Sequence, residues 1–228
     1  MTAPTPTLPH RGGGSLRTTG AILVYVALVL GVDALAYLEV AWPFEWKVFR
    51  WVWGDVEIFK LLFWLFIPLA FCWRNLDRGW YGIARWRAGD VILLIVVAGV
   101  GGLLLLLIPL VPELREGYTG IGALSAAVKR EFVIGISIWT LTWLPGWEFL
   151  LRYVLLRAVA AQWPRYGWWL VPLAEGLYHL QKAWPETLAA VLFSAVLSWW
   201  ALRRRNGLLP LVAHLIIEIE LIALMLMW

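Results

Sequence analysis

The sequence predicts an all-α fold, a polytopic transmembrane helical bundle of about seven spans, and three observations support this class. Hydrophobic residues make up 62% of the 228 residues and charged residues only 15%. A soluble domain carries roughly 25% charged and 45–50% apolar residues, so much of this apolar surface is expected to face lipid. Apolar runs of about 20 residues, the length that crosses a bilayer, recur along the chain. The 18 tryptophans are typical of rings that lie at the membrane–water interface.

The spans follow from these runs and from the polar segments between them. Residues 1–18, rich in Pro and Gly, are predicted to form a disordered tail, and residues 43–57, rich in Trp and charge, to lie in the interface. Pro145-Gly146 is expected to bend or restart the fourth span, because proline lacks the backbone donor that a helix uses. The predicted spans are Thr19–Trp42, Ile58–Trp73, Asp90–Val111, Phe132–Gln162, Trp168–Lys182, Pro185–Leu202 and Leu208 to the C-terminus.

The distribution of Lys and Arg predicts the orientation of the bundle. The densest basic clusters beside spans lie in residues 74–88 and 203–207, and such clusters favour the cytoplasmic side. We therefore expect the N-terminus inside, in a bacterial-type inner membrane, with lipid as the surrounding partner. The net charge of +4 is spread over loops and does not indicate nucleic-acid binding. The single cysteine, Cys72, excludes an internal disulfide and a cysteine-based metal site.

Ionisable residues inside the predicted spans gather in the C-terminal half of the chain. Each costs roughly 2.5–3.5 kcal/mol on insertion scales, so these side chains are expected to face the bundle interior. Six of them form three pairs at i,i+4 spacing, which puts both members of a pair on one helix face. Asp33 has no partner visible in the sequence and Glu220 is out of phase with the third pair, so neither is assigned. The pairs are Glu148 with Arg152, Glu175 with His179, and His214 with Glu218.

Two imidazoles and several carboxylates in one place can perform two kinds of chemistry. They can bind a divalent metal such as zinc, with His179, His214 and Glu148 as ligands, or they can activate a water molecule as a general base. The His-Glu-x-x-His pattern of zinc proteases and the Gly-x-Ser-x-Gly nucleophile motif are both missing from the sequence. Ser194 and Ser198 have no basic partner at helical spacing and are interpreted as packing residues. The alternative is that each pair is only a structural contact between helices.

Three short motifs on separate predicted spans resemble those of a known family. Pro145 to Arg152 reads Pro-Gly-Trp-Glu-Phe-Leu-Leu-Arg, Tyr178-His179-Leu180 follows, and Arg205 to Glu218 contains Asn-Gly, a Pro and His-Leu-Ile-Ile-Glu. Their order and spacing are similar to those of the CPBP family of intramembrane proteases, also called the Abi or CAAX-protease family, which includes bacteriocin-processing enzymes. The resemblance covers residues from about 132 to 225, with motifs that are each short.

The resemblance implies an intramembrane endopeptidase that acts on a membrane-associated peptide, prenylated in the CAAX branch of the family. Residues 132–228 would form the catalytic-type core and residues 19–131 the additional N-terminal spans. In this reading Glu148 is a metal ligand or base, and Arg152 holds the carboxylates. His179 and His214 bind the metal or polarise the substrate carbonyl, and Glu218 orients the site.

Three positions depart from the family pattern. Trp147 stands where the family has the first Glu of a Glu-Glu pair, which is thought to activate the attacking water. Glu175 replaces the Phe four residues before the second-motif His, and Glu218 replaces the final Asn or Asp. Because Glu175 shares a helix face with His179, we expect its carboxylate to point between His179 and His214 and to substitute for the missing base.

Two other functions remain open on the sequence. Loss of the first Glu is also compatible with a degenerate relative that binds a membrane partner or a prenylated peptide without cleaving it. A small transporter is the third reading, and inverted repeats would support it. The sequence shows no convincing internal repeat.

Overall fold

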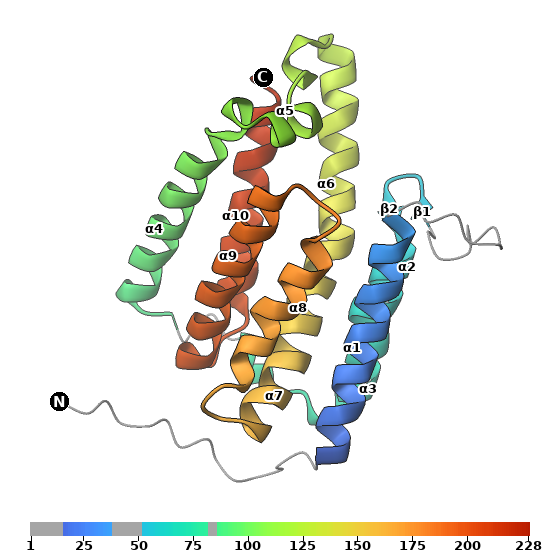
Figure 1. Ribbon diagram of the computed structural model, residues 1–228, viewed down its shortest axis with the longest axis vertical. Coiled ribbons are helices and arrows are strands. Elements are labelled where there is room, and N and C mark those ends of the chain that lie inside the picture. The colour runs from blue at the N-terminus through green and yellow to red at the C-terminus, as the bar shows by residue number, and fades with distance from the viewer. Residues whose placement is uncertain (1–15, 38–51, 82–85) are drawn as a thin grey trace.

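Helices form nearly all of the structure, which confirms the all-α class. The computed structural model describes residues 16–37, 52–81 and 86–228 (Figure 1). Its α-helices are α1 Leu16–Tyr37, α2 Ile58–Lys60, α3 Ile67–Cys72, α4 Ala88–Leu105, α5 Pro112–Tyr118, α6 Ala126–Glu148, α7 Leu156–Gln162, α8 Leu170–His179, α9 Trp184–Arg204 and α10 Leu208–Met225.

Two π-helical segments make longer helices out of these pieces. Segment η2, Leu61–Phe66, joins α2 to α3, and segment η8, Phe149–Leu155, joins α6 to α7. Short 3₁₀ turns complete the connections at Trp73–Asn75, Arg78–Tyr81, Ile108–Leu110, Ile121–Ala123 and Gly167–Trp169. Before α2 lies a small antiparallel hairpin, in which β1, Val52–Trp53, pairs with β2, Val56–Glu57.

Five of the described helical stretches are long and apolar enough to cross a membrane. They are Leu16–Ala36, Ile58–Asn75, Ala88–Leu110, Trp184–Arg204 and Leu208–Met225. Each overlaps a predicted span, which supports the polytopic architecture. The predicted span Trp168–Lys182 is reduced to the ten residues of α8 after a 3₁₀ turn. Ten residues rise about 15 Å, half of a hydrocarbon core of about 30 Å, so α8 alone is too short to cross it.

The predicted boundaries differ from the structure at the N-terminus. The tail was expected to extend through residue 18, but α1 begins at Leu16, because Leu16–Thr18 continue the helical pattern of the apolar run. The rest of that tail, residues 1–15, lies outside the described residues, as do the predicted end of the first span, 38–42, and most of the interfacial segment, 43–51.

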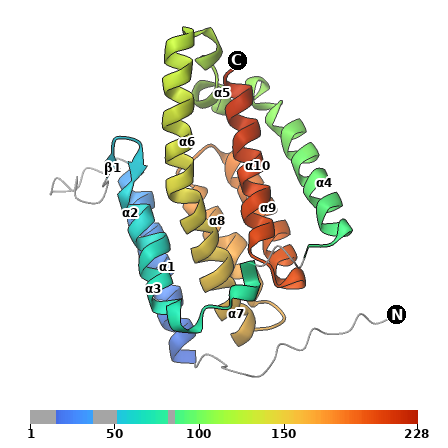
Figure 2. The same cartoon turned by 180° about the vertical axis from the view of Figure 1, so that it is seen from behind.

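The helices pack as a central group with two flanks. Helices α6, α8, α9 and α10 lie together, α1 and the η2–α3 segment cover one side, and α4 contacts α10 on the other (Figures 1 and 2). A buried apolar cluster joins the first flank to the centre, with Trp64, Trp147 and Leu151 among its members. Gly146 permits this close packing, since a Cβ at that position would come within 3.0 Å of the Trp64 Cβ.

A tight turn between α9 and α10 sets the start of the last helix. Arg205 adopts a left-handed backbone with φ of 48° and ends α9. The side-chain oxygen of Asn206 then accepts a hydrogen bond from the backbone N–H of Leu208 at 2.9 Å, which satisfies an otherwise unpaired donor in the first turn of α10. The Gly207 N–H donates to the carbonyl of Trp80 at 2.6 Å. The turn therefore fixes α10, and with it His214, against the segment that follows α3.

Candidate active site

The first pair of site residues lies where the helix changes its winding. The sequence predicts an interruption at Pro145-Gly146, but α6 continues through both residues and the irregularity follows them, as the π-helical segment η8. Glu148 closes α6 and Arg152 lies in η8, and their exposed fractions are 2% and 0%. Single π-helical turns within α-helices are frequent at functional sites. The junction of α6 and η8 thus carries a charged pair that lies in the interior of the bundle.

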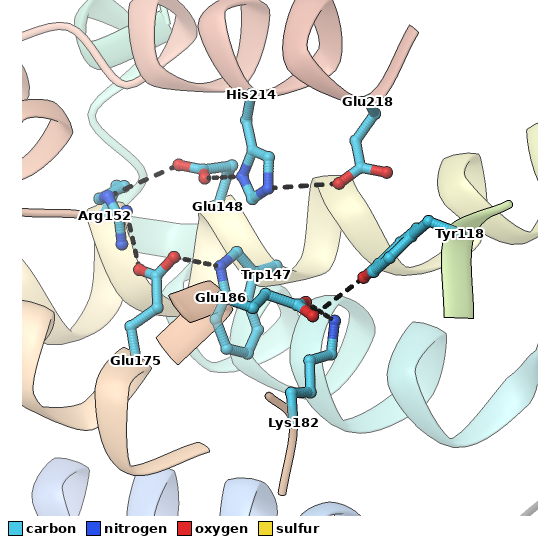
Figure 3. A network of polar contacts seen from close by, with 9 residues as sticks. All are labelled: Tyr118, Trp147, Glu148, Arg152, Glu175, Lys182, Glu186, His214 and Glu218. Carbon is cyan, nitrogen blue, oxygen red and sulfur yellow. Dashed lines mark hydrogen bonds and ion pairs between the residues drawn. The ribbon is translucent and has the colours of Figure 1, made fainter. Parts of the chain in front are cut away.

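Arg152 lies between two carboxylates that come from different helices. Its Nη2 donates to Glu175 Oε2 of α8 at 2.9 Å, and its Nε is 3.7 Å from Glu148 Oε2 (Figure 3). Glu175 is only 2% exposed. A buried carboxylate is tolerated when a cation is close enough to compensate its charge. Arg152 is therefore the centre of a three-residue cluster that connects η8 to α8, which we call the Arg152 cluster.

His214 extends the Arg152 cluster onto α10. Its Nδ1 is 2.8 Å from Glu148 Oε1, and its Nε2 is 3.8 Å from Glu218 Oε1 (Figure 3). Because an ionised carboxylate only accepts hydrogen bonds, Nδ1 is assigned as the donor in this contact. Nε2 then faces Glu218 at a distance too long for a direct hydrogen bond. The second ring nitrogen of His214 is thus directed to the less buried end of the network.

His179 is oriented by the backbone of its own helix. Its Nδ1 is 2.8 Å from the carbonyl oxygen of Glu175, which can only accept, so Nδ1 carries the proton and Nε2 keeps a lone pair. The ring meets Trp147 edge-on, with centroids 6.0 Å apart. This tautomer leaves Nε2 as a base. His179 is thus joined to Glu175 through the main chain and to Trp147 through the ring.

Trp147 occupies the middle of the site, which the sequence did not predict. Its side chain is 2% exposed, and its Nε1 donates to Glu175 Oε1 at 3.4 Å. Its ring also packs against Tyr178, with centroids 4.9 Å apart. The sequence did mark this position, because Trp147 directly precedes Glu148 and stands where the resembled family has a glutamate. A buried indole needs an acceptor for its N–H, and Glu175 supplies it.

Glu175 has the environment of a site residue and not of a surface carboxylate. Lys182, three residues after His179, pairs with Glu186 and not with Glu175. Both oxygens of Glu175 face the cluster, one toward Arg152 and the other toward Trp147 (Figure 3). The position of Glu175 next to a cation was not foreseen, because i,i+4 spacing does not show which side chains of other helices are near.

A separate group of polar contacts lies near the end of the bundle and consists of Tyr118, Lys182 and Glu186. Tyr118 of α5 donates from its Oη to Glu186 Oε2 at 2.9 Å, and Glu186 also pairs with Lys182 (Figure 3). Burial and the neighbouring Glu186 both raise the pKa of the Tyr118 phenol, so it stays a hydrogen-bond donor. The negative charge of Glu218 also raises the pKa of the Tyr118 phenol.

The metal hypothesis can be compared with the arrangement of donors. Among the described residues, no group of three or more His, Cys, Asp or Glu side chains is placed to hold a metal ion. The predicted ligand set of His179, His214 and Glu148 is therefore not assembled here, and Arg152 puts a positive charge beside Glu148. A zinc ion stays a prediction, and the mechanism below does not depend on one.

The two residues that the sequence left unassigned lie away from the Arg152 cluster. Asp33 of α1 accepts a hydrogen bond from Tyr178 Oη at 2.6 Å and is 3.8 Å from Lys60 Nζ. Lys60 is also 3.5 Å from Glu57 Oε1. Glu220 of α10 lies beside Gly102 of α4. Asp33 thus belongs to another buried polar group, with Lys60 and Glu57. This group contacts α8, the helix of His179, through Tyr178.

Comparison with known proteins agrees with the motifs. Residues 130–219 match the family model described as type II CAAX prenyl endopeptidase Rce1-like. The predicted resemblance is thereby confirmed over this segment, which contains all six residues of the three pairs. No curated protein and no solved structure matched the chain.

Proposed function

Because residues 130–219 of this membrane protein match the Rce1-like type II CAAX prenyl endopeptidase family, we propose that the chain cleaves a membrane-associated peptide with a water activated by Glu and His. The observation that carries this proposal is the Arg152 cluster. It holds Glu148 and Glu175 together in the bundle interior and presents His214 beside them. A prenylated peptide is the substrate class that the family name suggests.

Amide hydrolysis needs a base for water and a group that stabilises the oxyanion. Glu175 is the proposed base, with the lone pair on His179 Nε2 as a second acceptor for the proton. Water loses a proton to this base as its oxygen bonds to the peptide carbonyl carbon. The C–N bond then breaks, and the amine leaves after it takes up the same proton.

His214 is the proposed oxyanion group. When its ring is protonated, Nδ1–H is held by Glu148 at 2.8 Å and Nε2–H is available to the carbonyl oxygen. Glu218, 3.8 Å from Nε2, favours the charged ring and orients it. Arg152 holds both carboxylates in place and keeps their negative charges compensated. Each proposed role thus uses a contact made within the matched segment.

The test is an assay of peptide cleavage with purified protein in lipid vesicles. A prenylated CAAX-type peptide is the substrate, and its products are separated by mass. Glu175→Gln is expected to lower the cleavage rate by roughly 10²–10⁴-fold, because it removes the base and keeps the side-chain shape. Glu116→Gln, an exposed change on α5, is the matched control and is expected to keep the native rate. A native rate in Glu175→Gln would exclude Glu175 as the base.

One observation favours a second candidate, a non-catalytic relative that binds such a peptide. Trp147 stands where the family has the first Glu of its Glu-Glu motif, and its indole N–H donates a hydrogen bond to one oxygen of Glu175. Indole cannot act as a base. The variant Trp147→Glu separates the two functions. It preserves or raises cleavage if the native chain is active, whereas cleavage that appears only in this variant identifies the native chain as a binding protein.

A further inference from the structure

Several buried polar atoms around Arg152 have no hydrogen-bond partner within the described ranges 16–37, 52–81 and 86–228. They are Nε and Nη1 of Arg152, Oε2 of Glu148 and Oγ of Ser194. The three side chains are 0%, 2% and 0% exposed, respectively. Buried polar groups in proteins are nearly always hydrogen-bonded, and a charged group without a partner is especially costly. The set therefore indicates a ligand that supplies these hydrogen bonds.

The geometry shows where such a ligand fits. Arg152 Nε and Glu148 Oε2 are 3.7 Å apart, too far for a direct hydrogen bond, although one is a donor and the other an acceptor. A polar contact longer than 3.5 Å is one that a water can complete by bonding to both groups. Ser194 of α9 lies beside the carboxylate of Glu175, which itself binds Arg152, so its hydroxyl can donate to that carboxylate while its lone pairs stay available to a water. The orphaned atoms thus belong to one connected group of side chains.

The chemistry of the group selects the ligand. An anion would suit the two guanidinium donors but would be repelled by Glu148 and Glu175. A cation would suit the carboxylates but would be repelled by Arg152. Neutral molecules that both donate and accept suit all of the atoms. Because the N–H bonds of Nε and Nη1 point in different directions, one water cannot reach both, so the group needs at least two waters, each of which makes two to four hydrogen bonds.

From this combination we propose that Glu148, Arg152 and Ser194 form an internal water site in the membrane-embedded core. The site lies directly behind His214, because the other oxygen of Glu148 accepts from His214 Nδ1. In the proposed hydrolysis, a step that rests on the proposed function, this site stores water beside Glu175, where lipid excludes the bulk solvent. Ser194, interpreted from the sequence as a packing residue, then becomes a ligand of water.

X-ray hydroxyl-radical footprinting of the native protein in lipid tests the site without any substrate. Radicals formed from a bound water label the nearest side chains, so Trp147, next to Glu148, is compared with Trp200. Both indoles are buried, at 2% and 1% exposure, and each donates to a carboxylate, Trp147 to Glu175 and Trp200 to Asp90. Trp147 is expected to be oxidised several-fold faster than Trp200. Equal or slower oxidation of Trp147 would overturn the proposal.

A pair of hydroxyl deletions adds a second test. Ser194→Ala removes one partner of the water and is expected to slow the oxidation of Trp147 several-fold. Thr140→Val removes another buried hydroxyl with no partner among the described residues, about two turns before Glu148 on α6, and is expected to leave the oxidation rate unchanged. An unchanged rate in Ser194→Ala contradicts the site. Rapid oxidation of Trp147 in a protein that cleaves no peptide supports the water site and refutes only the proposed function.

Discussion

The guanidinium of Arg152 donates to the carboxylate of Glu175 at 2.9 Å, and neither side chain is more than 2% exposed. The two residues are 23 positions apart in the chain, so the contact joins η8 to α8. A buried ion pair has little net effect on stability when it replaces apolar packing, but a partner left alone is strongly destabilising. The contact therefore ties the position of Glu175 to the presence of Arg152.

The first prediction concerns this ion pair. Arg152→Gln leaves two buried carboxylates without a cation and is expected to lower the free energy of unfolding by about 3–5 kcal/mol. Adding Glu175→Gln removes one of the uncompensated charges, so the double variant is expected to lose less stability than the sum of the two single losses. Reversible unfolding in mixed micelles measures all four proteins. Additive losses would show that the two side chains do not interact.

The second prediction concerns the tautomers of the two site histidines. His179 donates from Nδ1 to a carbonyl and His214 from Nδ1 to Glu148. Nitrogen-15 solid-state NMR of the protein in lipid is therefore expected to show a protonated Nδ1 in both rings. For His179 it should also show an unprotonated Nε2 at neutral pH. A proton on His179 Nε2 alone would remove this ring from the base of the proposed reaction.

The third prediction concerns the buried hydrogen bond between α1 and α8. Tyr178→Phe removes the donor to Asp33 and leaves that carboxylate with one fewer partner. The expected loss is about 1–3 kcal/mol in the free energy of unfolding, the range for bonds to charged groups. Tyr166→Phe, at a side chain that is 62% exposed, is the control and is expected to change stability little. Equal stability of both variants would show that the Asp33 contact contributes nothing.

The fourth prediction concerns orientation in the membrane. The Gly207–Trp80 hydrogen bond places the described residues of the two basic clusters, 74–81 with 86–88 and 203–207, at one end of the bundle. The positive-inside rule then predicts that this end is cytoplasmic. In a Cys72→Ala background, Arg203→Cys is expected to react with an impermeant maleimide only after the membrane is opened. Glu116→Cys, on α5, should react from outside, because α5 lies at the other end of the bundle (Figure 1). The reverse pattern would invert the topology.

The sequence predicted the helical class and the three polar pairs because both depend on local patterns, apolar runs and i,i+4 spacing. It could not predict the partners of Glu175 and Asp33, which depend on how separate helices meet. Arg152 of the π-helical segment η8 approaches Glu175 of α8, a contact between residues 23 positions apart that local spacing does not reveal. The predicted span Trp168–Lys182 was already a short one, and α8 is shorter still, because Trp168 and Trp169 belong to a 3₁₀ turn and the helix ends at His179. Trp147 was recognised as a departure, but its role as a donor to Glu175 required the packed structure.

The most direct test of the central claim is mass spectrometry of a prenylated CAAX-type peptide after incubation with the native protein in water enriched in oxygen-18. Attack by an activated water predicts a shortened peptide whose new carboxyl group carries one heavy oxygen. Glu175→Gln should yield almost no such product, while Glu116→Gln should yield the native amount. Intact peptide with the native protein, under conditions in which Trp147→Glu cleaves it, would contradict the proposal that the native chain is an endopeptidase.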